Sequence, residues 1–279
     1  MRNIALDQSI DTDDLMRWRA MKEESLRAED GWLTLIGLFW LEPGEQAFGT
    51  SGDCPIQLPA GKAPARAGSF TLQGQQVLLR AEPGAGVLLD GAPVSAEPVP
   101  VAAGRKPALV TLGDITMFVI ERGGRFAIRA RDRQHPARAA FAGREWFAPD
   151  PSWRITAEFT PHEPPRTLPI MNIVGIAEET PNPGTVSFTL DGQEYRFEAL
   201  GARDGLFIIF RDATNGAGSY PAGRFIDAPA PEDGRVMLDF NCAYSPPCAF
   251  TDFATCPLPP PQNRLPLRVE AGERYQGQH

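Results

Sequence analysis

Three of the chain's four cysteines lie in one segment, DFNCAYSPPCAFTDFATCPLPPPQNRL, which covers residues 239–265. Cys242, Cys248 and Cys256 are six and eight residues apart, and the three histidines lie outside the segment. A structural zinc site usually takes four soft ligands in two close pairs. The spacing therefore predicts no metal site, and we expect buried structural thiols in turns braced by proline. A disulfide between Cys248 and Cys256 stays an alternative, which a reducing compartment would disfavour.

Nucleophilic and cofactor chemistry finds little support in the sequence. A reactive cysteine needs a partner base to form its thiolate, and His135, the candidate base, is distant from the cysteines in the chain. The chain has no G-x-S-x-G elbow, no P-loop and no dinucleotide glycine motif. We therefore expect no cofactor, and the sequence leaves open whether the protein is an enzyme.

Charged and polar residues alternate with apolar ones on several predicted strands. In RFAIRARD, residues 125–132, the two-residue period places Arg129 on a polar face, and in VMLDFN it places Asp239 and Asn241 on one face. On an ordinary sandwich such side chains face solvent, whereas inside a barrel they converge on a pocket and leave donors for an anionic ligand. The candidate ligand-binding residues are Arg129, Arg224, Asp239, Asn241, Tyr244, Cys248 and Asn263.

The cysteine-bearing segment is also rich in proline. Proline fixes φ and has no backbone N–H, so residues 239–265 cannot form a central strand. We expect a rigid cover across one end of a barrel, with a pocket beneath it. Its prolines are Pro246, Pro247, Pro257, Pro259, Pro260 and Pro261.

The elements that must position these residues are mostly strands. The segment TDDLMRWRAMKEESLRAE, residues 12–29, predicts a helix. Short apolar runs separated by glycine and proline pairs predict strands through the rest of the chain, with tight turns at Asp90-Gly91, Gly123-Gly124 and Asp191-Gly192. The fold class is therefore mainly β.

We expect three parts in this mainly β fold. They are an N-terminal helix in residues 1–30, a small β-sandwich in residues 31–104, and a larger antiparallel β-barrel or curled sheet in residues 105–279. The boundary is placed at the linker-like stretch AEPVPVAAGRKPA, residues 96–108.

Composition excludes several classes of partner. The chain has 279 residues with 27 glycines and 28 prolines, which suits many strands joined by tight turns. A net charge of −8 argues against a nucleic-acid binder. The N-terminus has no leader pattern, and no window has the length and hydrophobicity of a membrane span. We therefore expect a cytoplasmic protein without a membrane or nucleic-acid partner, and the oligomeric state stays open.

Several motifs are familiar as a set. The stretches GWLTLIGLFWLEPGEQAFG, RFAIRARD, RDATNGAGSYPAGRF and DFNCAYSPPCAFTDFATCPLPPPQNRLPLRVEAGE extend from residue 31 to residue 273. Together they resemble a widespread bacterial family of unknown function, of the DUF1684 type. The resemblance implies no reaction, because that family has no established activity.

A second resemblance lies in the first half of the chain. Residues 48–94 are similar to a forkhead-associated (FHA) domain, through Gly49, Ile56, Leu58, Pro59, Asp90 and Gly91. Phosphothreonine reading in that family implies an arginine just after the first glycine, and a serine with a histidine in the later loop. Here Thr50 and Ser51 follow Gly49, and no histidine precedes His135. Phosphothreonine recognition is therefore not expected.

Two functions follow from these observations. The first is binding of, or action on, a small polar or anionic metabolite in a pocket of the C-terminal β-domain. The alternative is a protein-interaction module that uses the FHA-like sandwich, with the barrel as its support.

Overall fold

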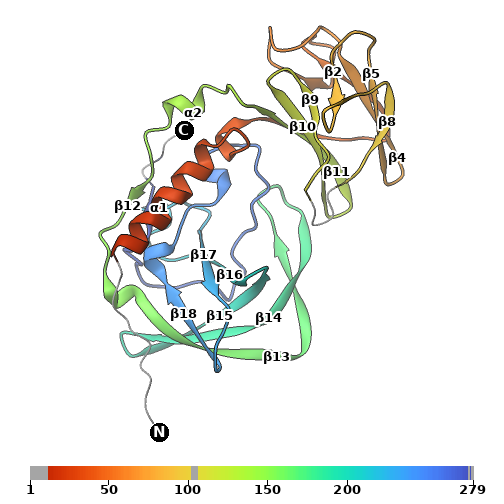
Figure 1. Ribbon diagram of the computed structural model, residues 1–279. Coiled ribbons are helices and arrows are strands. Elements are labelled where there is room, and N and C mark those ends of the chain that lie inside the picture. The colour runs from red at the N-terminus through yellow and green to blue at the C-terminus, as the bar shows by residue number, and fades with distance from the viewer. Residues whose placement is uncertain (1–11, 102–105, 276, 278–279) are drawn as a thin grey trace. The chain divides into compact units, whose positions relative to one another are not determined.

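The computed structural model describes residues 12–101, 106–275 and 277, and the chain is mainly β with one long helix, as the sequence predicted (Figure 1). Its contacts divide it into two compact units. We call Leu26–Phe141 the sandwich unit, and Met1–Ser25 together with Ala142–His279 the barrel unit. No helix in the described part of the chain has both the length and the apolar character needed to cross a membrane.

The N-terminal helix α1 spans Thr12–Arg27, two residues shorter at its end than predicted. Acidic residues in the first turn and a basic residue in the last turn complement the helix dipole. The buried side of α1 is only partly apolar, because Arg19 is buried there as well as Leu15. Within the barrel unit this helix therefore packs through charged as well as apolar contacts.

The sandwich unit consists of two β-sheets around one apolar core. The rings of Phe48 and Phe70 lie 5.1 Å apart in that core, and both side chains are fully buried. Short elements η1 (Trp32–Thr34) and α2 (Ala137–Ala140) lie outside the sheets. One sheet has the order β1 (Leu35–Trp40), β11 (Arg125–Asp132), β10 (Ile115–Arg122), β9 (Val110–Leu112), β6 (Leu88–Leu89), β7 (Ala92–Pro93), and the other β3 (Ile56–Gln57), β2 (Gly44–Gly49), β4 (Gly68–Gln73), β5 (Gln76–Ala81), β8 (Ala96–Val99).

Long-range pairing extends the sandwich well beyond the expected residue 104. Strand β1 pairs with β11, so that Leu38 lies opposite Arg129, and β10 pairs with β11 along its whole length. The residues from 106 to 141 therefore complete this unit. The sequence placed β1 and β2 around one turn, and the structure places them in different sheets.

The barrel unit is built on a six-stranded antiparallel sheet. Its end strands, β17 and β18, approach each other, so that the sheet is nearly closed. Aromatic side chains fill the interior, among them Phe188, Phe197, Phe210 and Phe240. The order is β17 (Arg224–Pro229), β16 (Gly205–Phe210), β15 (Gln193–Ala202), β14 (Ala177–Leu190), β13 (Arg154–Met171), β18 (Arg235–Asp239).

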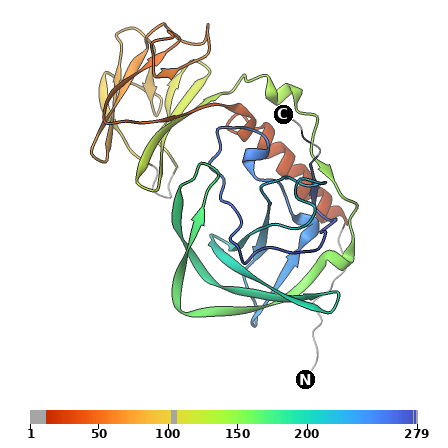
Figure 2. The same cartoon turned by 180° about the vertical axis from the view of Figure 1, so that it is seen from behind.

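Two of these strands are unusually long. Strands β13 and β14 form a bent ribbon that Figures 1 and 2 show from opposite sides. A separate two-stranded sheet joins β12 (Glu145–Trp146) to β19 (Glu273–Arg274). A short 3-10 turn, η2 (Pro151–Trp153), precedes β13.

The segment 239–265 is irregular, as its prolines predicted. After Asp239, the last residue of β18, its regular elements are the 3-10 turns η3 (Phe240–Cys242) and η4 (Pro247–Ala249). Backbone bonds tie it to the sheet at separate places: Tyr244 pairs with Phe225, Leu258 N–H donates to the Met171 carbonyl, and Arg211 N–H donates to the Asn263 carbonyl. Phe240 enters the aromatic core. The segment is therefore part of the barrel unit's core as well as a covering of its strands.

Candidate functional site

Arg224, a candidate ligand residue, is occupied by the protein itself. Its side chain is fully buried, and its Nη2 lies 2.7 Å from Asp212 Oδ2 and 2.9 Å from the Val269 carbonyl oxygen. Its Nη1 donates to the Ala271 carbonyl. Burial lowers the pKa of this guanidinium, and Asp212 opposes that shift. Arg224 therefore holds residues 269–271 against the barrel.

Asn241 and Asn263 use their amides on backbone groups. Asn241 accepts from the Asp150 N–H and donates to the Asp150 carbonyl, both at 2.9 Å. Asn263 accepts from the Glu198 N–H at 2.7 Å and donates to the Glu198 and Ile209 carbonyls at 2.9 Å. Both side chains are at most 1 % exposed. Each amide therefore donates to and accepts from the backbone of one residue, as a neighbouring strand does in a regular sheet.

Tyr244 and Asp239 make hydrogen bonds within the barrel unit. The Tyr244 hydroxyl donates to Asp227, and the Lys22 ammonium lies 3.8 Å from the centre of its ring. Burial, with Asp227 nearby, raises the pKa of Tyr244. Asp239 accepts from the Asn241 N–H and so begins the turn η3.

Arg129 lies in the other unit. It belongs to β11 of the sandwich, where its guanidinium lies 5.3 Å from the centre of the Trp32 ring and its side chain is buried. The expected grouping of Arg129 with Arg224 and Asp239 placed it in the barrel. Its strand instead pairs with β1 and β10.

The described cysteines are free thiols. The Cys248 N–H donates to Cys256 Sγ at 3.2 Å, and a hydrogen bond from Cys256 lowers the pKa of Cys248. Burial raises the pKa of Cys242 to about 12. No group of three or more metal-ligating side chains occurs among the residues that the structure describes.

A cluster that the sequence analysis missed lies on the bent ribbon. Strands β13 and β14 pair up to Pro161 with Gly184, and pairing resumes at Arg166 with Asn182. Residues 162–165 therefore stand opposite Pro183 alone, which makes a wide bulge. The run PHEPPR, with prolines around charged residues inside a strand, was the available signal.

The bulge brings His162 to Glu198 of β15. His162 Nε2 lies 3.2 Å from Glu198 Oε2 and 2.7 Å from Arg166 Nη2, while Arg166 Nη2 lies 3.5 Å from Glu198 Oε1. The side chains of His162 and Glu198 are 11 % and 13 % exposed, and that of Arg166 is 54 % exposed. A nearly buried carboxylate is thus held beside an imidazole and a half-exposed guanidinium.

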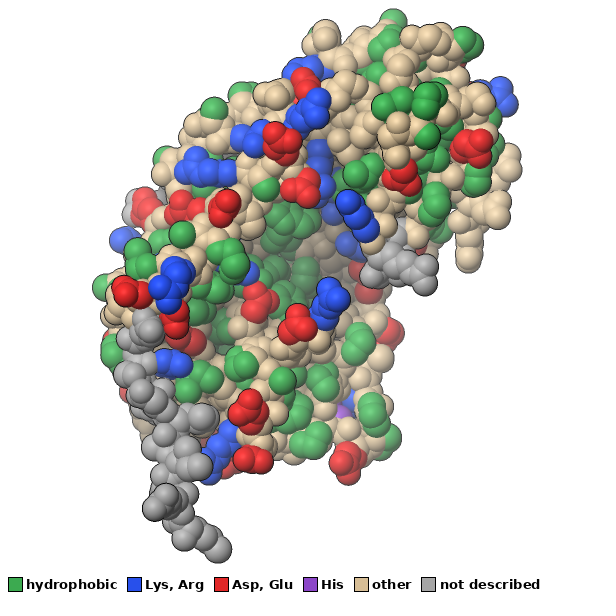
Figure 3. Space-filling model, in the orientation of Figure 1, with side chains coloured by type: hydrophobic (Ala, Val, Ile, Leu, Met, Phe, Trp, Pro, Cys, Tyr) green, Lys and Arg blue, Asp and Glu red, His purple; other side chains and the backbone are tan. Residues whose placement is uncertain are grey.

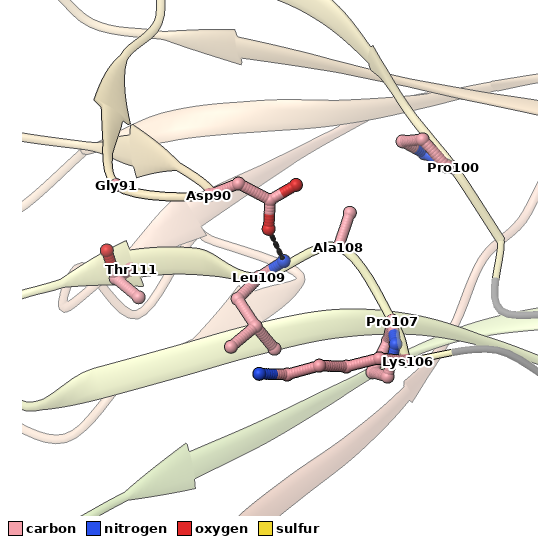
Figure 4. A pocket seen from close by; sticks show the side chains of 8 residues that line it. All are labelled: Asp90, Gly91, Pro100, Lys106, Pro107, Ala108, Leu109 and Thr111. Carbon is pink, nitrogen blue, oxygen red and sulfur yellow. Dashed lines mark hydrogen bonds between the residues drawn. The ribbon is translucent and has the colours of Figure 1, made fainter.

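The sandwich unit carries an open trough of about 580 Å³ (Figure 4). Asp90, in the turn between β6 and β7, has a φ of +49° and accepts from the Leu109 N–H at 2.8 Å through Oδ1. Its other carboxylate oxygen points away from this bond in Figure 4. The lining residues are Asp90, Gly91, Pro100, Lys106, Pro107, Ala108, Leu109 and Thr111.

The loops that follow Gly49 carry cations with acidic partners. Lys62 Nζ lies 3.3 Å from Asp132 Oδ2, and Arg66 Nε lies 4.0 Å from Glu82 Oε1. Lys62 and Arg66 are therefore already paired with carboxylates.

A Cβ on Gly49 would lie 2.3 Å from the Ala65 carbonyl oxygen, so the close approach of the two loops requires glycine at this position.

Comparison with known proteins gives a family without an assigned activity. Residues 139–274 match the model of a family described as a protein of unknown function, DUF1684. One similar solved structure is the solution NMR structure of an uncharacterized protein from Haloarcula marismortui, with 38 % sequence identity. The match covers 51 % of this chain and 82 % of that protein, with a TM-score of 0.43. No curated protein matches the chain.

Solved FHA domains are similar to the N-terminal part of the chain. One, from a study of phosphothreonine-dependent FHA domain interactions, is 21 % identical, covers 35 % of this chain and 96 % of its own, and has a TM-score of 0.25. Another, the FhaA FHA domain in complex with an intracellular domain, is 21 % identical over 34 % of this chain and 97 % of its own, with a TM-score of 0.24.

Proposed function

With residues 139–274 matching a family of unknown function, DUF1684, we propose that this protein binds a segment of a partner protein through its sandwich unit. The observation that carries the proposal is the open trough beside Asp90 and Lys106. The core of the sandwich is closely filled by residues such as Phe48, Phe70 and Ile128. A ligand of this unit is therefore expected on its surface.

The chemistry of the trough suits an extended peptide. Its lining combines apolar groups, including Leu109 and Pro107, with one carboxylate from Asp90 and one ammonium from Lys106. A peptide could place a basic side chain near the acid and an acidic side chain near the lysine. Apolar contact would then supply affinity, and the two charges would set orientation.

The loops after Gly49 argue against phosphate as the recognised group. A phosphate dianion requires several charge-assisted donors. Lys62 and Arg66 each have a carboxylate partner. We therefore expect the protein to bind phosphothreonine peptides no better than the matching threonine peptides.

Photo-crosslinking on the full-length protein tests the proposal. A benzoylphenylalanine replaces Thr111, an uncharged residue that lines the trough, or, as the control, Glu45, an exposed residue of β2 in the same unit. A partner selected from a peptide library should crosslink at position 111 and not at position 45. Charge reversal by Lys106→Glu should weaken its binding, since the opposite sign then meets the acidic residue of the peptide.

Equal crosslinking at both positions would show non-specific contact. A peptide whose affinity is unchanged by Lys106→Glu binds elsewhere, and the trough would then lose its assigned role. On the face shown in Figure 3, basic and acidic side chains are interspersed.

A further inference from the structure

The cluster of His162, Arg166 and Glu198 cannot satisfy all its polar atoms at once. A guanidinium only donates hydrogen bonds, so Arg166 Nη2, 2.7 Å away, requires His162 Nε2 to act as an acceptor. That nitrogen then has no proton to offer Glu198 Oε2 at 3.2 Å. Two acceptors therefore face each other, while Arg166 stays 3.5 Å from the carboxylate.

A second feature of the same face is a buried hydroxyl group without a hydrogen bond. Thr185 lies directly opposite Glu198 in the pairing of β14 with β15, so that both side chains project on one side of the sheet. Thr185 is 1 % exposed, and its hydroxyl oxygen has no hydrogen-bond partner among the residues that the structure describes. Buried polar atoms are rarely left unpaired without a functional or structural cause.

Neighbouring groups keep the cluster in place. Asn182 is buried, donates to the Ala199 carbonyl at 2.8 Å and accepts weakly from Arg166 Nε at 3.4 Å. The bulge that carries His162 contains Pro164 and Pro165, which restrict its backbone. The Arg166 side chain, by contrast, is half exposed. Arg166 is therefore the member that is able to turn toward a ligand.

We propose that His162, Arg166 and Glu198 form a binding site for an oxyanion, a phosphate or carboxylate group of a small molecule. The anion takes the guanidinium of Arg166, for which two parallel N–H donors are suited. Released from Arg166, His162 adopts the tautomer with the proton on Nε2 and donates to Glu198. The three side chains then all have partners. This site lies in the barrel unit and is independent of the trough on the sandwich unit.

The proposal predicts opposite effects from two neighbouring substitutions. Glu198→Gln removes the carboxylate that competes for Arg166, so the anion should bind at least about two- to fivefold more tightly, because even a solvent-exposed ion pair contributes that much and Glu198 is only 13 % exposed. His162→Ala leaves Glu198 to pair with Arg166 alone, so the anion should bind more weakly. Arg166→Gln should abolish saturable binding.

The test titrates the full-length protein and its variants with inorganic phosphate and, separately, with succinate. Calorimetry gives the affinity, and the 15N-NMR signal of the Gly184 amide, which lies at the edge of the bulge, reports where the anion binds. Arg196→Gln is the control for Arg166→Gln, because it removes an exposed arginine from β15, the strand that carries Glu198. Thermal melts establish that each variant is folded.

Saturable binding that is lost in Arg166→Gln, kept in Arg196→Gln and tightened in Glu198→Gln supports the site. The choice between phosphate and succinate identifies the class of anion. Absence of saturable binding in both the natural protein and Glu198→Gln overturns the proposal. Equal loss in Arg166→Gln and Arg196→Gln also overturns it, since the anion would then respond only to net charge.

Discussion

At the scale of single residues, polar side chains inside this fold replace missing backbone pairs. Arg224 caps the carbonyls of the irregular residues 269–271, and Asn263 bonds both backbone groups of Glu198. Buried backbone groups require partners, and an irregular segment cannot supply them through a regular ladder. Arg224 and Asn263 are therefore structural anchors in this fold, although polar residues that line a pocket would give the same sequence pattern.

Replacing Arg224 by methionine should lower the free energy of unfolding by about 3–5 kcal/mol, because the change leaves Asp212 as an uncompensated buried charge. Chemical denaturation measures the loss. The control is Arg235→Met, which removes an exposed arginine from β18 and should change stability by at most about 0.5 kcal/mol. Similar losses in the two variants would contradict the anchoring role of Arg224.

Cys242 should react slowly with iodoacetamide at pH 8 in the folded protein. Burial raises its pKa to about 12, from an ordinary value of 9.0, and only the thiolate reacts. Because the folded-state pKa is raised, the neutral thiol's contribution to stability is complete below about pH 9 and is lost as the pH rises toward 12. Peptide mass spectrometry measures the alkylation rate. A rate equal to that of the denatured chain would contradict the raised pKa of this half-buried thiol.

At the scale of elements, the proline-rich segment 239–265 lies so close to neighbouring backbone that two positions beside it require glycine. Gly223, just before β17, has a φ of +114°, and a Cβ there would lie 2.6 Å from Pro259 Cγ and 2.7 Å from the Phe210 carbonyl oxygen. Gly272 is comparable, since its Cβ would lie 2.4 Å from the Ala243 carbonyl oxygen. The segment 239–265 therefore packs closely against Gly223, just before β17, and against Gly272.

The Gly223→Ala variant should be less stable than Gly192→Ala by about 1–3 kcal/mol, the usual cost of overpacking. Both glycines have positive φ, but a Cβ at Gly192 would meet nothing within 4 Å. The comparison therefore separates the steric contact from backbone strain, which both variants share. Thermal and urea unfolding provide the measurement, and equal stabilities would show that the segment yields at Pro259.

At the scale of the whole molecule, each of the two units has a large apolar core of its own. One core surrounds Phe48 and Phe70 in the sandwich unit, and the other surrounds Phe197 and Phe240 in the barrel unit. Each core joins strands of its own sheets. Local opening of one core is therefore expected to leave the other protected, as in proteins with separate cooperative units.

Phe70→Ala should speed hydrogen exchange in the strands of the sandwich unit and leave β14–β16 of the barrel unit unchanged. The truncation removes a fully buried ring and should cost about 3–5 kcal/mol within that unit. Phe240→Ala should produce the reverse pattern. Exchange measured by mass spectrometry decides the matter, and a uniform increase through the whole chain would indicate a single cooperative unit instead.

The sequence by itself determined the local structure. Two-residue periods predicted strands, Gly and Asp-Gly pairs predicted their turns, and prolines predicted that residues 239–265 would be irregular. The structure has positive φ at Asp90 and Asp191, in two of the predicted turns. Such features depend on φ and ψ preferences of a few adjacent residues, which a sequence displays directly.

Only the tertiary structure decided which strands pair and what each polar side chain contacts. Because β11 pairs with β1, Arg129 belongs to the sandwich unit and not to the barrel unit. The bulge in β13 places His162 beside Glu198, which is 36 residues away in the chain. Arginine on a strand has the same period whether it faces solvent, a ligand or a buried carboxylate. Its environment is set by residues that long-range pairing brings together, and neither period nor composition encodes that pairing.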